Sequence, residues 1–522
     1  MRKTRNHVGK NKIKYKIRGG AYCLILIGLH SPGLAWAEES KLNMQLMKKN
    51  VQKFLAPESS EDYRKVSLNE LSKFDYQQNE TQSLPVITGT NATGTNPVVV
   101  MDSAPFSMTG ALPAKISIYD AVKIAVLRHP DIAQSISSLS SQNANIDVAK
   151  AGYYPQLTGG LGTGDMTSGE AGRQLLTLSA TQMLYDFGKV KSGVNVEKAR
   201  LHVAQANVLV SIDDISTQVA TAIVNIRRYQ EITRIAREQI KGISRIAEIA
   251  NLRANAGISS QDDPIQAQSY IESAQSNLIA QETQLSMYKQ RLRTLVGRDI
   301  SSSRLEIPDS MISASDLYSE TQFNRIPNMM AAKAGVDVAK SQKEQTNLSR
   351  YPTLSVRGSL SQALNGVNPN NNKDNGFYDS IMLEATSNFY QGGAVASQTK
   401  AASFAEEAAK ARVSSVYLDV LDQTRLAREQ IENRQRQMQV LIAQQETTVR
   451  TKELYQEQYK LGTRTVVDLL NAEQQIHSAN SQIESARYDI YDNLVQYISA
   501  SGKARDVYQL NNLSIQGVEI QP

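Results

Sequence analysis

Two acidic residues stand at the same distance behind two glycines in this 522-residue chain. Asp263 follows Gly257 by six residues, and Asp468 follows Gly462 by six residues. Arg464 lies close to the second glycine, and a guanidinium can form a charge-assisted pair with a carboxylate. Partly exposed pairs of this kind contribute only about 1 kcal/mol. On these residues alone, ordinary charges at helix ends are the favoured interpretation.

Side chains that could perform catalysis or bind metal are few and scattered. The sequence contains no P-loop, no HExxH, no GxSxG and no glycine-rich dinucleotide turn. Beyond residue 37 the histidines are His129, His202 and His477, which lie far apart and lack metal-ligand spacing. Each is expected to be a solvated or helix-capping residue. The sequence therefore predicts no enzyme, no cofactor and no metal site.

Long helices must position the residues around the two glycines. Residues 394–461 contain neither Gly nor Pro and would span about 100 Å as a helix. Second helices are expected over about 264–296 and 467–500. Gly257 and Gly462 would then permit the left-handed backbone that ends one helix before the next begins. Apolar residues recur at steps of 3, 4 or 7, the spacing of a packed seam: Val413, Val416, Val420, Ala427, Ile431, Met438 and Leu441.

The same landmarks occur twice along the chain. A Tyr-Pro pair and an earlier Xaa-Pro pair each recur at an offset of 197 residues. The offset becomes 205 after the loop NGVNPNNNKDNG, which only the second copy contains. We interpret the pattern as a tandem repeat over 115–300 and 312–505. The matched landmarks are Pro130 and Pro327, Pro155 and Pro352, Tyr185 and Tyr390, Gly257 and Gly462, and Gly297 and Gly502.

Each copy also contains two stretches in which apolar and polar residues alternate. Period-two alternation over 10 to 14 residues is typical of strands, and a transmembrane strand needs about 9–11 residues. A soluble hairpin fits these residues equally well. The apolar sets are Leu157, Gly159 and Leu161; Leu176, Leu178 and Ala180; Leu354, Val356 and Leu360; and Ile381, Leu383 and Ala385. The opposite rows include Thr177, Ser179, Thr181, Ser380, Met382 and Glu384.

Four strands per chain are too few to close a sheet in lipid. The smallest membrane barrels have about eight strands, and an open edge would leave backbone groups unpaired. If the hairpins lie in a membrane, the protein must oligomerise. Three chains would supply twelve strands and leave a lumen, which the polar row of Ser, Thr and Glu favours over a filled eight-stranded barrel.

The N-terminal stretch has the pattern of a signal peptide. Residues 1–20 carry eight Lys or Arg and no acid, 21–28 are apolar, and Ala35-Trp36-Ala37 is a small-x-small cleavage site. Cleavage after residue 37 changes the net charge from +6 to −2, so the basic excess gives no reason to expect nucleic-acid binding. It also removes Cys23, the only cysteine, and leaves no thiol for a disulfide or a metal.

The remaining segments complete the expected domain organisation. Residues 38–114 are a polar extension with a short amphipathic stretch at 42–55 and a flexible linker at 88–97. A linker is expected at 301–311 and a C-terminal tail at 506–522. No later segment has 18 consecutive apolar residues, so no transmembrane helix is expected.

The segment YKLGTRTVVDLLNAEQ, residues 459–474, resembles the helix-turn-helix tip of the TolC-like outer membrane export family. YDFGK, the Tyr-Pro strand entry and the two-copy arrangement agree with this family over about 115–505. The resemblance implies a homotrimer with a twelve-stranded transmembrane β-barrel in the outer membrane. A long periplasmic α-helical barrel with a mixed equatorial belt would continue it. The implied partners are outer-membrane lipid, a periplasmic adaptor (membrane fusion) protein and an inner-membrane ABC or other transporter.

The resemblance also assigns roles at the tip. Tyr459 and Arg464 match gate residues on one helix, and Asp263 matches their acidic partner, so a periplasmic gate becomes the favoured interpretation. Members of the family often place two acidic residues near the tip, which form a carboxylate ring that selects cations. Here Asp468 occupies the first position and Asn471 the second, so three carboxylates instead of six predict a weaker ring.

The function implied is that of an exit duct in a tripartite export system. The YDFGK turn and the absence of a lipobox favour type I protein secretion over multidrug efflux. A periplasmic coiled-coil adaptor or scaffold is the alternative from another class. The paired strands at equivalent places in both copies argue against it.

Overall fold

The computed structural model describes residues 114–520, except 167–169, 302, 369, 389 and 516. The predicted signal peptide, the amphipathic stretch at 42–55 and the linker at 88–97 lie outside the described residues. Within the described part of the chain, no helix combines the length and the apolar character needed to cross a membrane.

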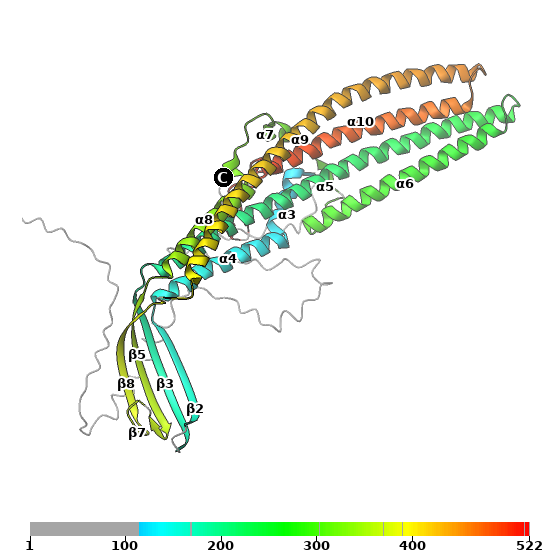
Figure 1. Cartoon of the computed structure of the whole chain (residues 1–522). Coiled ribbons are helices and arrows are strands. Elements are labelled where there is room, and N and C mark those ends of the chain that lie inside the picture. Colours follow the sequence, from blue (N-terminus) through cyan, green and yellow to red (C-terminus); the bar gives the residue numbers. More distant parts are fainter. Residues whose placement is uncertain are drawn as a thin grey trace, which may run out of the picture. The chain divides into compact units, whose positions relative to one another are not determined.

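Two long helical hairpins dominate the described chain (Figure 1). The first consists of α5 (Lys189–Asn255) and α6 (Asp262–Val296), and the second of α9 (Ala394–Lys460) and α10 (Val466–Ala500). The helix predicted for 394–461 is thus confirmed to within a residue. Both α5 and α9 contain 67 residues, which corresponds to about 100 Å. The hairpins contact each other, because α10 packs against α5 as well as against α9.

A shorter helix precedes the strands in each half of the chain. These are α4 (Pro130–Lys150) and α8 (Pro327–Leu348), and each begins with proline in its first turn. Proline is tolerated there because the first N–H groups of a helix have no partner within the helix. The short helix, two strands and two long helices therefore follow one another in the same order in both halves.

The three histidines differ in their surroundings. His129 Nδ1 accepts a hydrogen bond from the Asp131 N–H at 3.3 Å, so the predicted capping role is confirmed for this residue. His202 is exposed and lies 3.1 Å from Gln205. The expectation is wrong for His477, which is buried against Glu473 within α10.

Four strands form one antiparallel sheet in the order β2-β3-β5-β8. The strands are β2 (Gln156–Met166), β3 (Glu170–Tyr185), β5 (Thr353–Asn365) and β8 (Phe377–Thr386). Their register places Leu178 opposite Leu360, and Ile381 opposite Gly358. The predicted alternation is confirmed, and the apolar face is exposed along its length: Leu157, Leu161, Leu176, Leu178, Leu360, Ile381 and Leu383.

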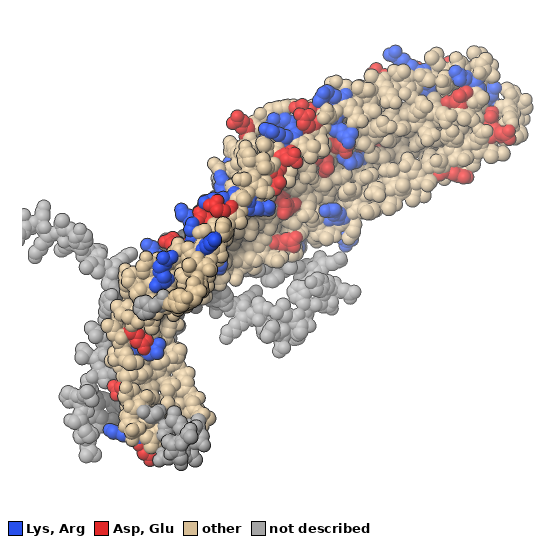
Figure 2. Space-filling view, viewed as in Figure 1, with Lys and Arg blue, Asp and Glu red and all other residues tan. Residues whose placement is uncertain are grey.

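The opposite face of the sheet carries polar pairs that bridge neighbouring strands. Thr158 Oγ1 lies 2.6 Å from Ser179 Oγ, and Ser359 Oγ lies 2.7 Å from Ser380 Oγ. Arg357 forms an ion pair of 3.4 Å with Glu384. In the space-filling view, Lys, Arg, Asp and Glu are spread over the helices and are sparse over the sheet (Figure 2). The sheet therefore has one apolar and one polar face.

The asparagine-rich loop between β5 and β8 is folded tightly. It contains the short strands β6 (Val367–Asn368) and β7 (Lys373–Asp374), which pair with each other. Asn368 is fully buried, and its Nδ2 donates to the carbonyl oxygens of Ser361 at 3.2 Å and Gly376 at 2.8 Å. Most described residues of this polar loop are at least partly exposed to solvent, and its asparagine side chains also satisfy backbone carbonyls within and beside the loop.

A mixed region of short elements surrounds the middle of the long helices. It comprises β1 (Lys115–Ser117), which pairs in parallel with β4 (Arg304–Glu306), and the short antiparallel pair β9 (Ser514–Ile515) and β10 (Val518–Glu519). The helical pieces are α3 (Ile118–Arg128), α7 (Ser310–Ser315), η2 (Phe323–Arg325) and α11 (Ala504–Val507). The short helix η1 (Ala151–Tyr153) instead joins the end of α4 to β2 and contacts β3 of the sheet.

The largest apolar core of the described chain lies in this region. It joins α3 and the middle of α5 to the ends of α6 and α10. The segments expected as a linker and a tail contribute to it, because Leu305, Tyr508, Leu510 and Ile515 are buried there. Both segments are therefore parts of the folded core.

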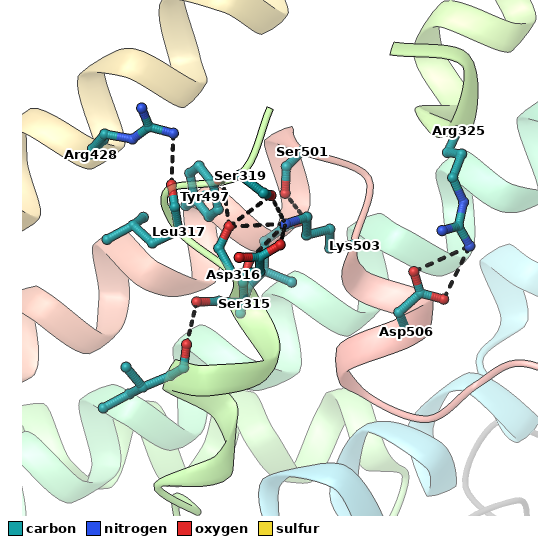
Figure 3. A network of polar contacts seen from close by, with 12 residues as sticks. Ser315, Asp316, Leu317, Ser319, Arg325, Arg428, Tyr497, Ser501, Lys503 and Asp506 are labelled. Carbon is teal, nitrogen blue, oxygen red and sulfur yellow. Dashed lines mark hydrogen bonds and ion pairs between the residues drawn. The ribbon is translucent and has the colours of Figure 1, made fainter. Parts of the chain in front are cut away.

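Cationic side chains fix the loop between α7 and η2 to the long helices (Figure 3). Lys503 Nζ, just after α10, donates to the carbonyl oxygens of Ser315 and Asp316 at 3.0 Å each. Arg428 Nη2, on α9, donates to the carbonyl oxygen of Leu317 at 2.7 Å. These bonds hold the loop against the second hairpin at the level of the core.

Asp213 is a buried carboxyl group in this core and makes stability depend on pH. Burial raises the pKa of Asp213 to about 7, against the opposing effect of the nearby Arg505 guanidinium. Neither carboxylate oxygen has a hydrogen-bond partner among the described residues. The folded protein thus holds this proton more tightly than the unfolded chain, and the free energy of unfolding falls as pH rises from about 4 to about 7.

Replacing Asp213 with asparagine is expected to remove this pH dependence. The variant should melt at nearly the same temperature as the parent at pH 5 and at a higher temperature at pH 8, with a gain of up to about 4 kcal/mol. The measurement is thermal unfolding at both pH values. Asp419→Asn, at an exposed position on α9, is the control and should behave like the parent. A parent-like loss of stability between pH 5 and 8 in Asp213→Asn would contradict the assignment.

Candidate functional site

The two hairpin turns have the same backbone geometry. Gly257 has φ 70° and Gly462 has φ 76°, both in the left-handed region. The Ile258 N–H donates to the Arg253 carbonyl at 2.9 Å, and the Thr463 N–H donates to the Gln458 carbonyl at 3.0 Å. Each bond closes the last turn of the long helix, as in a Schellman motif. The two glycines thus set the direction in which the chain reverses in each hairpin.

Tyr459 lies buried between the two hairpins near these turns. Its side chain packs in an apolar cluster formed by α5, α6, α9 and α10. The Arg253 guanidinium of α5 lies 4.9 Å above the Tyr459 ring, and Arg253 Nη1 donates to the Lys460 carbonyl at 3.3 Å. Burial raises the pKa of Tyr459, and the negative charge of Asp263 adds to the effect. The Asp263 carboxylate is thus close enough for its charge to act on Tyr459, although the Tyr459 hydroxyl has no hydrogen-bond partner among the described residues.

Arg464 contacts residues of its own hairpin. Its Nε–H donates to Gln458 Oε1 at 3.0 Å, and its guanidinium lies 4.5 Å from the centre of the Tyr455 ring. Its closest carboxylate is Asp468, at 3.7 Å. Within the described part of this single chain, no ion pair joins Arg464 to Asp263. The pairing of these two residues stays a prediction.

Asp468 is the third residue of α10 and helps to cap the helix together with the N-cap residue Thr465. The backbone N–H and the hydroxyl of Thr465 donate to Asp468 Oδ2 at 3.3 and 2.9 Å, and the Asp468 N–H donates back to Thr465 Oγ1. This reciprocal arrangement is a capping box. Asn471, one turn further, accepts a hydrogen bond of 2.7 Å from the Tyr270 hydroxyl of α6. An acidic ring built from Asp468 stays a prediction.

Arg253 is the residue at this site that sequence reasoning missed. A basic residue in the last turn of a helix predicts only a favourable charge at the helix end. Its contacts with Tyr459 and Lys460 depend on α5 and α9 ending side by side, over 200 residues apart in the chain. No local pattern in the sequence carries that information.

Aromatic residues gather where the sheet meets the long helices. Phe187 has φ 57°, stacks on Tyr351 at 5.3 Å between ring centres and meets the edge of Tyr185 at 4.8 Å. Tyr154 and Tyr390 are also exposed here. Aromatic rings with a polar atom are enriched where a membrane meets water. The site thus has two ends: an apolar-faced sheet with an aromatic border, and a pair of polar hairpin tips.

This combination defines a chain that lies in a membrane at one end and reaches into an aqueous compartment at the other. The model of the outer membrane efflux protein family matches residues 121–298 and 317–503. The chain belongs to this family. Its members are channel proteins and not enzymes, and they lie in the outer membrane and extend into the periplasm.

Known relatives align with most of this chain. Outer membrane protein TolC of Vibrio cholerae is 24% identical over 383 residues, which cover 70% of this chain and 86% of that protein. Alkaline protease secretion protein AprF of Pseudomonas aeruginosa is 21% identical over 329 residues, 60% of this chain and 66% of that protein. The crystal structure of outer membrane protein VceC from Vibrio cholerae shares the fold. Its TM-score is 0.63 at 15% identity, over 74% of this chain and 96% of that one.

Proposed function

We propose that this protein forms a homotrimeric exit duct, which carries substrate from an inner-membrane transporter and a periplasmic adaptor to the outside. The sheet is the observation that supports this most directly. Its apolar face is exposed, and its edge strands β2 and β8 each pair with only one strand among the described residues. An open edge is not stable in lipid, so neighbouring copies must cover both edges.

Three copies would close the sheet into a barrel of twelve strands. Strand direction alternates along β2-β3-β5-β8, so β8 of one copy would run antiparallel to β2 of the next. The polar pairs, such as Thr158 with Ser179 and Arg357 with Glu384, would face the lumen. The apolar face and the aromatic border would contact lipid and its headgroup region.

The long hairpins would continue the barrel as a helical duct in the periplasm. Large apolar side chains remain exposed along α6 and α9 in the single chain, and neighbouring copies would cover them: Ile265, Ile279, Met287, Leu418, Leu426, Val440 and Leu454. The equal lengths of α5 and α9, and the two separate stretches matched by the family model, support a tandem repeat. The mixed region around the core would form the equatorial belt.

The tip residues would act as the periplasmic gate. The charge of Asp263 acts on Tyr459 within one chain, and Arg464 is exposed at the end of the second hairpin. Arg464 would reach Asp263 of a neighbouring copy when three tips converge. Contacts of about 1 kcal/mol each can be broken by an adaptor. Asp468 would contribute three carboxylates to the pore tip, because Asn471 replaces a second acid and is bonded to Tyr270.

Type I protein secretion is the substrate class that we favour. The YDFGK turn supports it, and one relative is named for secretion of an alkaline protease. Multidrug or small-molecule efflux is the second candidate, because the family is named for efflux. The duct itself contributes little to this choice, since the inner-membrane transporter selects the substrate.

The oligomeric state is the first test of the duct. The protein extracted from outer membranes in mild detergent should have three times the mass of the mature chain by native mass spectrometry. It should run as a trimer on gels until it is heated, since sheet closure pairs every backbone edge. A monomer or dimer that retains its strand content would contradict the proposal.

A further inference from the structure

A charged cluster of the second hairpin lies against α5 of the first, further from the turns than the tip contacts. Glu473 on α10 is 3% exposed. Its Oε2 forms an ion pair with Lys452 Nζ of α9, and its Oε1 lies 3.1 Å from His477 Nε2. Burying a carboxylate is unfavourable unless it is paired, and here a lysine and a histidine provide the partners. Glu473 is near the end of the segment that resembles the family tip, but the proposed gate uses neither it nor Lys452 and His477.

The backbone of α5 supplies the third side of the cluster. A Cβ at Gly242 would overlap Glu473 Oε1 and would lie 2.8 Å from Glu473 Cδ. Glycine is unfavourable in the middle of a helix, and Gly242 lies deep within the 67 residues of α5. The close approach of the carboxylate gives this glycine a physical reason. The only other glycine of α5 is Gly193, far towards the sheet.

The close contact of Glu473 with Gly242 therefore links the position of α10 to that of α5. Lys452 and His477 lie on the same hairpin as Glu473 and move with it, whereas Gly242 belongs to the other hairpin. Burial pushes the pKa of Glu473 upward, but the hydrogen bond from His477 and the pair with Lys452 outweigh this and leave the pKa below its ordinary value. The carboxylate is thus charged at neutral pH and held by its own hairpin.

We propose that Glu473, held by Lys452 and seated against Gly242, is a second latch that fastens the α9–α10 hairpin to α5 and keeps the duct closed. This inference rests on the proposed duct function. In this proposal, opening moves the second hairpin relative to the first, and Glu473 then leaves its position against Gly242. The Glu473 latch would act in addition to the contacts of Arg464 and Tyr459 at the tip.

The test uses one added methyl group and a matched control. Gly242→Ala displaces the Glu473 carboxylate, whereas Gly335→Ala on α8 adds the same group where it meets nothing within 4 Å. Hydrogen exchange of the α5 amides around residue 242 and single-channel current are recorded for the parent trimer and both variants. Gly242→Ala is expected to increase exchange and open probability about tenfold each. Gly335→Ala should match the parent.

A double variant separates direct contact from a general change in the helix. Glu473→Ala alone should reproduce the loosening, and Gly242→Ala should add nothing in the Glu473→Ala background, because the displaced group is gone. Additive effects, or exchange in Gly242→Ala equal to that in Gly335→Ala, would overturn the latch. If no variant conducts, Arg464→Ala included, while exchange changes as expected, the duct proposal fails and the fastening of the hairpins by Glu473 is supported.

Discussion

Alanine in place of Arg464 is expected to convert a mostly closed pore into a mostly open one. The side chain holds Gln458 at 3.0 Å and lies over Tyr455 in its own hairpin, and we propose that it reaches Asp263 of a neighbouring copy. A trimer loses three such contacts at once. At about 1 kcal/mol per contact, the closed state loses about 3 kcal/mol, roughly a hundredfold in the ratio of open to closed channels. Current across planar bilayers measures this ratio.

Lys460→Ala is the matched control for the gate. Lys460 carries the same charge four residues away, and its Nζ pairs only with Glu457 of its own helix, at 2.7 Å, among the described residues. Its removal should leave the current unchanged. An equal rise in both variants would assign the effect to lost positive charge at the tip. Unchanged current in Arg464→Ala, with insertion verified, would remove Arg464 from the gate.

Arginine in place of Leu178 is expected to prevent assembly of the sheet in the outer membrane. Leu178 lies in the middle of β3, opposite Gly159 on one side and Leu360 on the other, and its side chain points to the exposed apolar face. A charge at the midplane of a membrane barrel costs about 2–4 kcal/mol. A trimer carries three copies, so the loss is of order 10 kcal/mol. The measurement is the amount of heat-resistant trimer in the outer-membrane fraction.

Thr177→Arg is the matched control, because it places the same side chain on the polar face of the same strand. Thr177 immediately precedes Leu178 in β3, is exposed and lies on the polar face. Arginine there would project into the proposed lumen, so near-normal amounts of trimer are expected. Equal loss in both variants would show that β3 tolerates arginine on neither face, and would argue against a lipid-facing row. Normal assembly of Leu178→Arg would place the apolar face outside the membrane.

Local patterns in the sequence predicted most elements of this fold. The absence of Gly and Pro over 394–461 predicted α9 to within a residue, because helix formation depends mainly on neighbouring residues. The alternation around Leu178 and Ile381 predicted strands and their faces, because side chains of a strand point to opposite sides in turn. The folded core around Tyr508 was missed, because its partners lie elsewhere in the chain.

Contacts between the hairpins were decided by the tertiary structure alone. The sequence by itself determined the glycine turns, the seam of the long helices and the motif that carries Tyr459 and Arg464. The residues that Tyr459 and Arg464 contact depend on the register of the helices, that is, on how α5 is shifted along, and rotated relative to, α9 and α10. That register places Arg253 over Tyr459 and seats Glu473 at Gly242. This register is set by packing between side chains that are more than 200 residues apart in the sequence. The periodicity within one helix does not encode it.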